Sequence, residues 1–348
     1  MAAISALLIG LQVATSPIAL NQAELVSITH SPELAAVHGI TWIDVPEIEN
    51  GTVEVDLKLS KGRGFTGLLF RASDEMNGEK FYLRHHQQGK PDAWQYHPRY
   101  NGHQAYQIYQ GDGFAGNTNV PQDEWITLTL AFSGDNAQVS VNGDVIATMD
   151  DLKRESIKGR IGFWTLFGER SIRNIRVSEQ VDLEVMKAAD EDVAADPNLI
   201  QSWRVSQPFE AAQVQSFMQP EIIGPVVTVK ASHRGIADLN TVAPIADDKN
   251  TVLASIEVTS ETKQKAELEF GFSDKTAVYV NGALAYRGAD KFRSRDYRFL
   301  GTVGFYDTVT LDLNAGLNTI SVGVSEKEGG WAIAGRLLAD ETVKVVYD

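Results

Sequence analysis

The stretch WITLTLAFSGDNAQVSVNG, residues 125–143, contains two strand-like runs separated by a turn. In both runs apolar residues alternate with polar ones, a period of two that is typical of a half-buried β-strand. Asn142-Gly143 closes this stretch, and a second pair, Asn281-Gly282, closes TAVYVNG (276–282). Asn-Gly between alternating runs is the strongest short-range signal for a β-hairpin. The pattern therefore predicts antiparallel sheets in both halves of the chain.

Further short, β-rich runs bounded by turn residues lie on both sides of this stretch. In the N-terminal half they include TGLLFR (66–71), KFYLRH (80–85), RIGFWTLF (160–167) and SIRNIRV (171–177). In the C-terminal half they include VLASIEVTS (252–260), KAELEFGF (265–272) and NTISVGVS (318–325). Because neither half shows a long helical period, we predict an all-β protein with two antiparallel β-sandwiches of jelly-roll type.

The charge distribution locates the predicted boundary between the two sandwiches. The 348 residues include 31 basic and 46 acidic side chains, a net charge of −15. Residues 178–200 alone hold one lysine and seven acidic residues, with a composition that favours helix over strand. We therefore predict the following organisation: a possible signal peptide or N-terminal segment at 1–22, a sandwich at 23–177, a short acidic, partly helical connector at 178–200 and a second sandwich at 201–348.

Composition also excludes several function classes. The acidic charge and the lack of a basic stripe argue against nucleic acid as a partner. The chain has no cysteine, which excludes disulfides and thiolate nucleophiles, and no apolar run approaches the ~18–20 residues of a transmembrane helix. AAISALLIGLQVA (2–14) has about the length of a signal-peptide core, although no basic residue precedes it. We expect export to the periplasm or the cell exterior; the alternative is a buried segment of the fold.

The densest polar-aromatic stretch is FYLRHHQQGKPDAWQYHPRYNGHQAYQIY, residues 81–109. Strand alternation places Tyr82, Arg84 and His86 on one face and Phe81 on the other. An aromatic ring beside hydrogen-bond donors suits a sugar, whose C–H face packs on the ring while its hydroxyls need polar partners. We predict a ligand surface in which two rings stack on sugar and the basic residues donate: Arg71, Tyr82, Arg84, His86, Tyr96 and Trp164. The alternative is that these rings only fill the core.

The second half has one unusual cluster, KFRSRDYRFLG (291–301), with four basic residues inside an acidic chain. Two interpretations stay open. One is a buried arginine–carboxylate network that joins loops, with Asp296, Glu326 or Glu328 as partners. The other is a binding site with Trp331 as its platform; the candidate residues are Arg295, Asp296, Tyr297 and Trp331.

Metal patterns are weak in this sequence. The spacing of the histidines in 81–109 matches no standard zinc pattern, so we expect no transition metal. Calcium stays open, because it needs only loop carboxylates and carbonyls such as those of Gly111-Asp112-Gly113.

Several motifs resemble known families. GLLFRAS (67–73), FYLR (81–84), DEWITLTL (123–130), VSVNG (139–143) and GRIGFW (159–164) resemble the laminin G/concanavalin A-like jelly roll, with bacterial 3-keto-disaccharide hydrolase-like domains and pentraxin-like lectins as the nearest branch. Residues 200–345 resemble, more loosely, a galactose-binding-like jelly roll, through SDKTAVYVNG (273–282) and AGLNTISVGV (315–324).

The resemblance implies a carbohydrate-related function. Laminarinase-like members of this fold carry E-x-D-x-x-E, but here Glu54 and Asp56 are followed by Ser60 at the place of the second glutamate. Since a double displacement needs two carboxylates, we expect no catalytic pair. The leading hypothesis is an exported carbohydrate-binding protein. The alternatives are a glycoside or keto-disaccharide hydrolase-like enzyme, and a structural or adhesion scaffold with no small ligand. The sequence does not determine the oligomeric state.

Overall fold

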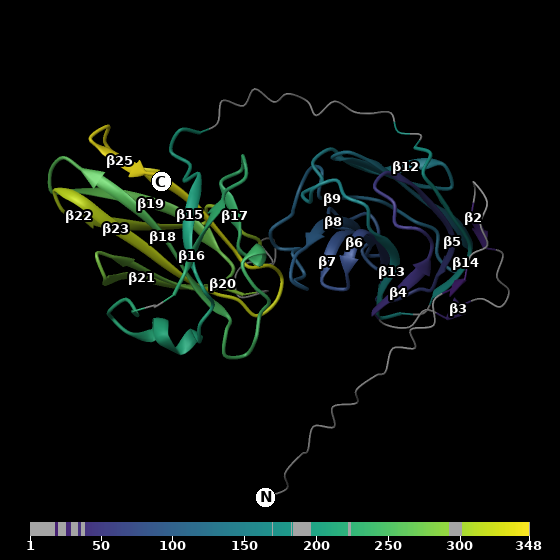
Figure 1. Ribbon diagram of the computed structural model, residues 1–348, viewed down its shortest axis with the longest axis horizontal. Helices are drawn as coiled ribbons and strands as arrows, with labels where there is room; N and C mark the ends of the chain where they lie inside the picture. Colours follow the sequence, from purple (N-terminus) through teal and green to yellow (C-terminus); the bar gives the residue numbers. More distant parts are fainter. Residues whose placement is uncertain are drawn as a thin grey trace, which may run out of the picture. The chain divides into compact units, whose positions relative to one another are not determined.

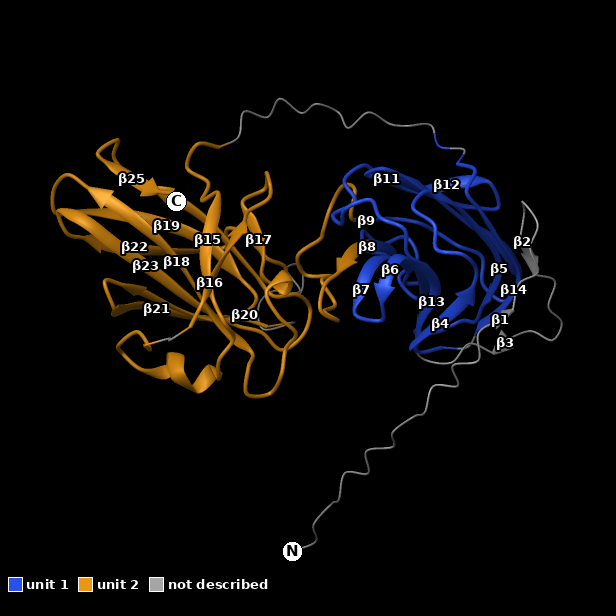
Figure 2. Ribbon diagram, in the orientation of Figure 1, with its two compact units in different colours: residues 1–95, 115–186 blue, residues 96–114, 187–348 orange. Residues whose placement is uncertain are grey.

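The computed structural model describes residues 18–19, 26–28, 34–35, 39–168, 170–181, 183, 196–221, 224–291 and 301–347. The chain forms two compact units, one of residues 1–95 with 115–186 and one of residues 96–114 with 187–348 (Figure 2). Both units are built from β-sheets (Figure 1), so the predicted all-β class with antiparallel sandwiches is confirmed.

The first unit contains two sheets, whose described strands pair antiparallel except for β1 with β4. One sheet has the order β1-β4-β13-β6-β7-β8-β9, with strands Ile18–Ala19 (β1), Gly39–Asp44 (β4), Arg160–Leu166 (β13), Phe65–Asp74 (β6), Asn77–Leu83 (β7), Trp94–Arg99 (β8) and Ala115–Gly116 (β9). The division between the two units falls inside β8, after Gln95. The other has the order β12-β11-β10-β5-β14-β2, with β3 paired to β14, and strands Asp144–Met149 (β12), Asn136–Val141 (β11), Trp125–Ser133 (β10), Gly51–Leu59 (β5), Arg170–Ser178 (β14), Val26–Ile28 (β2) and Leu34–Ala35 (β3).

Strand β5 illustrates how the alternating pattern builds the first core. Its inward side chains are apolar and fully buried: Val53, Val55, Leu57 and Leu59. On the opposite face Glu54 forms an ion pair with Arg176, and Asp56 accepts a hydrogen bond of 2.7 Å from Asn174. These two carboxylates are thus engaged in cross-strand pairs, as expected for a solvated strand face.

The second unit contains a larger and a smaller sheet. The larger has the order β16-β15-β18-β23-β20-β21, with β25 paired to β18, and strands Val226–Lys230 (β16), Ser202–Ser206 (β15), Thr251–Ser260 (β18), Gly316–Ser325 (β23), Asp274–Val280 (β20), Ala283–Asp290 (β21) and Val343–Val346 (β25). The smaller has the order β17-β24-β19-β22, with strands Ile236–Asp238 (β17), Ala332–Leu338 (β24), Gln264–Phe272 (β19) and Asp307–Leu313 (β22). Two short 3₁₀ helices, Ala211–Gln215 (η1) and Leu239–Thr241 (η2), accompany them.

Both predicted Asn-Gly hairpins form. Asn142 and Gly143 connect β11 to β12 with φ values of 53° and 89°, and Asn281 and Gly282 connect β20 to β21 with φ values of 49° and 83°. Two successive residues with positive φ define the turn that matches the twist of paired strands, and Asn-Gly adopts it at the lowest cost.

The unit boundaries differ from the predicted domains at residues 96–114, which the strand pattern alone assigns to the first sandwich. In the structure this segment packs on the second unit. The backbone N–H of Gln107 donates to Gly329 O (2.9 Å), and the N–H of Val303 donates to Gln107 O (3.0 Å). The hydroxyl of Tyr109 donates to Asp238 Oδ2 at 2.7 Å. Such pairing between distant segments leaves no local sequence signal.

Other predicted features fall outside the described residues. Most of the connector does so, namely residues 182 and 184–195, and so does most of the segment 1–22. Among the described residues, the structure contains no helix with the length and apolar character needed to cross a bilayer.

Candidate functional site

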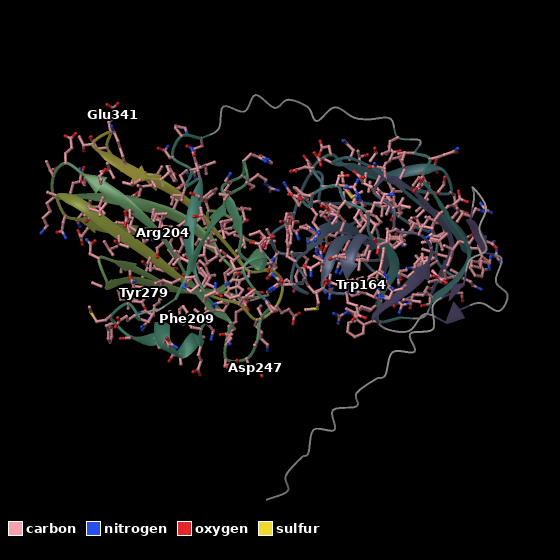
Figure 3. The ribbon with its side chains drawn as sticks, in the orientation of Figure 1. Trp164, Arg204, Phe209, Asp247, Tyr279 and Glu341 are labelled. Carbon is pink, nitrogen blue, oxygen red and sulfur yellow. The ribbon has the colours of Figure 1, made fainter. Side chains whose placement is uncertain are left out.

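Two aromatic rings of the first unit meet on one face of the β6-β7-β13 sheet. Register pairs Trp164 of β13 with Gly67 of β6, and Gly67 with Tyr82 of β7. Because Gly67 carries no side chain, the rings of Trp164 and Tyr82 approach across it, with centroids 5.1 Å apart and planes at 60° (Trp164 is labelled in Figure 3). A Cβ on Gly67 would lie 1.9 Å from the carbonyl oxygen of Phe81, so this arrangement requires glycine.

A buried lysine lies against both rings. Lys80 is two residues from Tyr82 on β7, and its Nζ lies 3.9 Å from the centroid of Trp164 and 4.9 Å from that of Tyr82. A buried ammonium is stabilised by the negative faces of aromatic rings. Strand alternation places Lys80 on the same face as Tyr82 and Arg84, a signal in the sequence that the predicted site did not include.

Arg84 extends this row beyond the end of β7 and is held by hydrogen bonds. Its guanidinium forms an ion pair with Asp92 and donates to Gln95 Oε1 and, at 3.2 Å, to the hydroxyl of Tyr82. The Tyr82 hydroxyl in turn donates to Gln95 Oε1 at 2.8 Å. We name Lys80, Tyr82, Arg84, Asp92, Gln95 and Trp164 the polar-aromatic cluster. Its donors are oriented before any ligand arrives.

The side of the cluster next to Arg84 is more accessible. Phe65 and His86 are half-buried there, with ring centroids 5.0 Å apart, and Arg63 and Phe167 are exposed. Phe65 also lies 6.1 Å from Tyr82, centroid to centroid. We name Arg63, Phe65, His86 and Phe167 the rim. The rim and the cluster together present aromatic surface next to hydrogen-bond donors.

Burial sets the protonation of the cluster and rim. Burial lowers the pKa of His86, and the nearby charges of Arg63 and Arg84 lower it further, so the ring is neutral at pH 7. Nδ1 of His86 lies 3.0 Å from the carbonyl oxygen of Gly64 and 3.3 Å from its backbone nitrogen, so Gly64 offers this atom a hydrogen-bond partner in either tautomer. Burial also raises the pKa of Tyr82, so its hydroxyl keeps its proton.

The structure brings together Tyr82, Arg84, His86 and Trp164, four of the six residues predicted for the ligand surface. Arg71 lies elsewhere, fully buried, with Nε 2.7 Å from Glu49 O and one terminal nitrogen 2.7 Å from Gly134 O. Because its donors bind backbone carbonyls, Arg71 has a structural role. Its place in the predicted surface is corrected accordingly.

Tyr96 is also separate from the cluster. It belongs to the second unit, is fully buried and stacks on Phe114 with centroids 6.1 Å apart. It follows Gln95 on β8, so strand alternation points its side chain to the opposite face of the sheet from the cluster. Tyr96 is therefore a core residue, and we leave it out of the site.

In the second unit, Arg295, Asp296 and Tyr297 lie outside the described residues. Trp331 is described and has 0% exposure; its indole N–H donates to Val324 O at 3.0 Å. A fully buried indole is part of the core and offers no stacking surface. Glu326 is also buried and accepts a hydrogen bond of 3.0 Å from Gly330 N. This contact fits a structural role better than an exposed binding site.

The histidines of residues 81–109 do not converge. His85 and His86 both follow the end of β7 in a turn, with centroids 6.4 Å apart and planes at 86°, whereas His97 and His103 belong to the second unit. Within the described ranges, no group of three or more histidine and acidic side chains has a geometry that could hold a metal ion.

A comparison with known protein families gives one match, in the N-terminal half of the chain. Residues 28–178 match the model of the 3-keto-alpha-glucoside-1,2-lyase-like domain, which confirms the resemblance of the first sandwich to 3-keto-disaccharide hydrolase-like proteins. All residues of the cluster and the rim lie inside this range. No curated protein matches the chain at a significant level.

Several solved structures are similar to part of this chain at low sequence identity. The carbohydrate-binding module CBM66 from Bacillus subtilis is 16% identical, and the match covers 44% of this chain and 95% of the module, with a TM-score of 0.31. A Bacillus subtilis protein with a galectin-like fold is 16% identical over 46% of this chain and 89% of its own, with a TM-score of 0.34. Domain 4 of the arabinanase AbnA from Geobacillus stearothermophilus is 14% identical, and the match covers 47% of this chain and 78% of that domain's chain, with a TM-score of 0.29.

Proposed function

We propose that this chain is an exported carbohydrate-binding protein whose first sandwich holds a saccharide at the rim, above the polar-aromatic cluster. The observation that carries the proposal is the Tyr82–Arg84–Gln95 network beside the Trp164 ring, inside the range that matches a domain family named for an α-glucoside. Arg84 and Asp92 can serve sugar hydroxyls, while Phe65 offers a ring to the C–H face.

The buried and accessible residues have different tasks in this proposal. Tyr82 and Trp164 are almost fully buried, so they form the floor that orients Arg84 and Phe65 rather than a free stacking platform. The side chains of Arg84 and Asp92 keep 13% and 23% of their surface exposed and can reach a ligand. The proposal therefore assigns direct contacts to Phe65, Arg84, His86 and Asp92.

Binding to a panel of oligosaccharides, measured by glycan array and then by calorimetry, tests the proposal. Tyr82→Phe keeps the ring but removes the hydroxyl that donates to Gln95, and we expect it to weaken saccharide binding about tenfold, the effect of roughly one net hydrogen bond. His86→Ala tests a direct contact. Arg176→Gln is the matched control, because Arg176 also pairs with a carboxylate in this unit but on the other sheet. Wild-type protein that binds no saccharide in the panel would overturn the proposal.

A second candidate is an enzyme that acts on a 3-keto-glucoside, and the family match favours it. In a 1,2-elimination the carbonyl at C3 acidifies the proton on C2, a base removes that proton, and the electron pair forms the C1–C2 double bond as the C1–O bond breaks; the departing aglycone oxygen takes up a proton from water. The neutral ring of His86 is the base that this candidate would use. Release of the aglycone from a 3-keto-glucoside by wild-type protein, and its loss in His86→Ala, would establish the enzyme.

A further inference from the structure

Phe167 combines exposure with backbone strain. The side chain is 43% exposed, although most aromatic residues of the first unit are buried. Its φ is 54°, in the left-handed region, where a bulky residue costs energy that glycine would not. Gly168 follows with φ of 71° and completes the turn after β13. A strained, exposed aromatic residue indicates a role other than stability.

A guanidinium lies over this ring. The Cζ of Arg63 is 4.8 Å from the centroid of Phe167 and 6.0 Å from that of Phe65, while the two phenyl rings are 6.4 Å apart. A guanidinium that lies over an aromatic ring still presents the N–H groups of its own plane at its edge, where they can bind an anion. Arg63 and Phe167 thus present a flat apolar surface with a positive edge.

A second arginine belongs to the same turn. Arg170 lies under the same turn, where it donates to Phe65 O at 2.8 Å and to Gly168 O at 3.0 Å. Arg170 is 4% exposed, so the accessible positive charge at this turn is that of Arg63. The nearby carboxylate of Asp92 forms an ion pair with Arg84. An exposed guanidinium attracts an anionic ligand.

We propose that Arg63 and Phe167 form an outer subsite that selects a saccharide bearing an anionic group, a carboxylate or a sulfate. The sugar ring packs on Phe167 and its anion binds the guanidinium of Arg63, because arginine matches the two oxygens of such groups. This inference rests on the proposed function, since the adjoining sugar unit lies at the rim near Arg84.

The test compares three oligosaccharides of equal length at one ionic strength: a neutral glucan, a uronate oligomer and a sulfated glucan. We expect wild-type protein to bind at least one anionic oligomer ten or more times tighter than the neutral one, with the preference decreasing as salt is added. Tighter binding of the uronate identifies a carboxylate, and tighter binding of the sulfated glucan identifies a sulfate. In Arg63→Gln we expect the ratio of the affinities for the anionic and the neutral oligomer to fall towards one. Equal affinities of wild-type protein for all three would overturn the inference while leaving the proposed function standing.

Phe167→Gly separates a ligand contact from a merely structural cap. Glycine relieves the left-handed strain, so we expect a melting temperature equal to or above that of the wild type, with at least fivefold weaker binding of the anionic oligomer. Met76→Ala is the matched control, because Met76 has the same 43% exposure and lies in the same unit, but away from the rim. A lower melting temperature with unchanged binding in Phe167→Gly would assign this ring to folding alone and refute the subsite.

Discussion

The hydroxyl of Tyr109 donates a hydrogen bond of 2.7 Å to Asp238 Oδ2, which joins two residues 129 positions apart in the chain. Asp238 also accepts a bond of 2.9 Å from Asn240 N at the start of η2. Burial raises the pKa of Asp238 to about 6, even though both hydrogen bonds lower it, and burial beside Asp238 raises the pKa of Tyr109 well above its usual value. This pair ties residues 96–114 to the second unit.

Tyr109→Phe is expected to lower the free energy of unfolding by about 1–3 kcal/mol, because it leaves a buried carboxylate with one donor fewer. Chemical denaturation followed by tryptophan fluorescence measures the loss. Tyr347→Phe is the comparison, because its hydroxyl also takes part in one hydrogen bond, from Gln201 N at 3.1 Å, but the residue is 41% exposed. A double-mutant cycle with Asp238→Asn isolates the pair. A coupling energy near zero would contradict the assignment of 96–114 to the second unit.

Stability is expected to fall as pH rises from about 5 to 8, owing to Glu326. Burial first, then the charge of Asp274, raises its pKa from 4.5 to about 8. Between these values the folded protein binds a proton that the unfolded chain has released, so this contribution is complete below pH 4.5 and lost as pH approaches 8. The loss is on the order of a few kcal/mol. Asp238 adds a smaller effect of the same sign between 3.8 and about 6.

Denaturation of wild-type protein and of Glu326→Gln at several pH values checks this expectation. The glutamine variant does not titrate, so its stability should change less between pH 5 and 8 than that of the wild type. Parallel profiles for the two proteins would refute the role of Glu326. The difference between the profiles matters more than either one alone, since other groups titrate in both.

Gly67→Ala is expected to destabilise the first unit by about 3 kcal/mol, through overpacking at the Tyr82–Trp164 contact. The added Cβ would meet backbone, 1.9 Å from Phe81 O, which has no room to move. Gly162→Ala in the same sheet is the comparison, because its Cβ would come 3.0 Å from the side chains of Ile40 and Trp42, which can shift slightly. In thermal denaturation, the melting temperature of Gly67→Ala should be clearly lower than that of Gly162→Ala. Equal melting temperatures would show that the rings do not depend on this gap.

Arg71→Met separates a structural arginine from a ligand-binding one. It removes donors to Glu49 O, Gly134 O and, at 3.1 Å, Asn50 Oδ1, so we expect a loss of about 3 kcal/mol in the free energy of unfolding. Saccharide affinity, measured at a temperature where the variant stays folded, should match that of the wild type. If folded Arg71→Met binds the saccharide more weakly than the wild type, Arg71 takes part in ligand binding and its purely structural role is refuted.

One part of the site can be predicted from neighbouring residues in the sequence, whereas the other part depends on the pairing of distant strands. Lys80, Tyr82 and Arg84 share a face because alternate residues of a strand point the same way, and their type and spacing are visible in the sequence. Trp164 joins them through the pairing of β13 with β6, which depends on register between strands almost a hundred residues apart. The rim depends on the turn at Phe167, which has a positive φ. Glycine is the usual residue at such a position, so a phenylalanine in the sequence does not predict this turn.

The sequence by itself determined the all-β class, the two hairpins and the row of polar and aromatic residues on β7, because alternation and turn chemistry are properties of neighbouring residues. Only the tertiary structure decided that Arg71, Tyr96 and Trp331 are buried structural residues and that residues 96–114 belong to the second unit. Burial is set by what the rest of the chain places against a side chain. The sequence alone therefore does not distinguish an arginine that donates to backbone carbonyls, such as Arg71, from one that donates to a ligand.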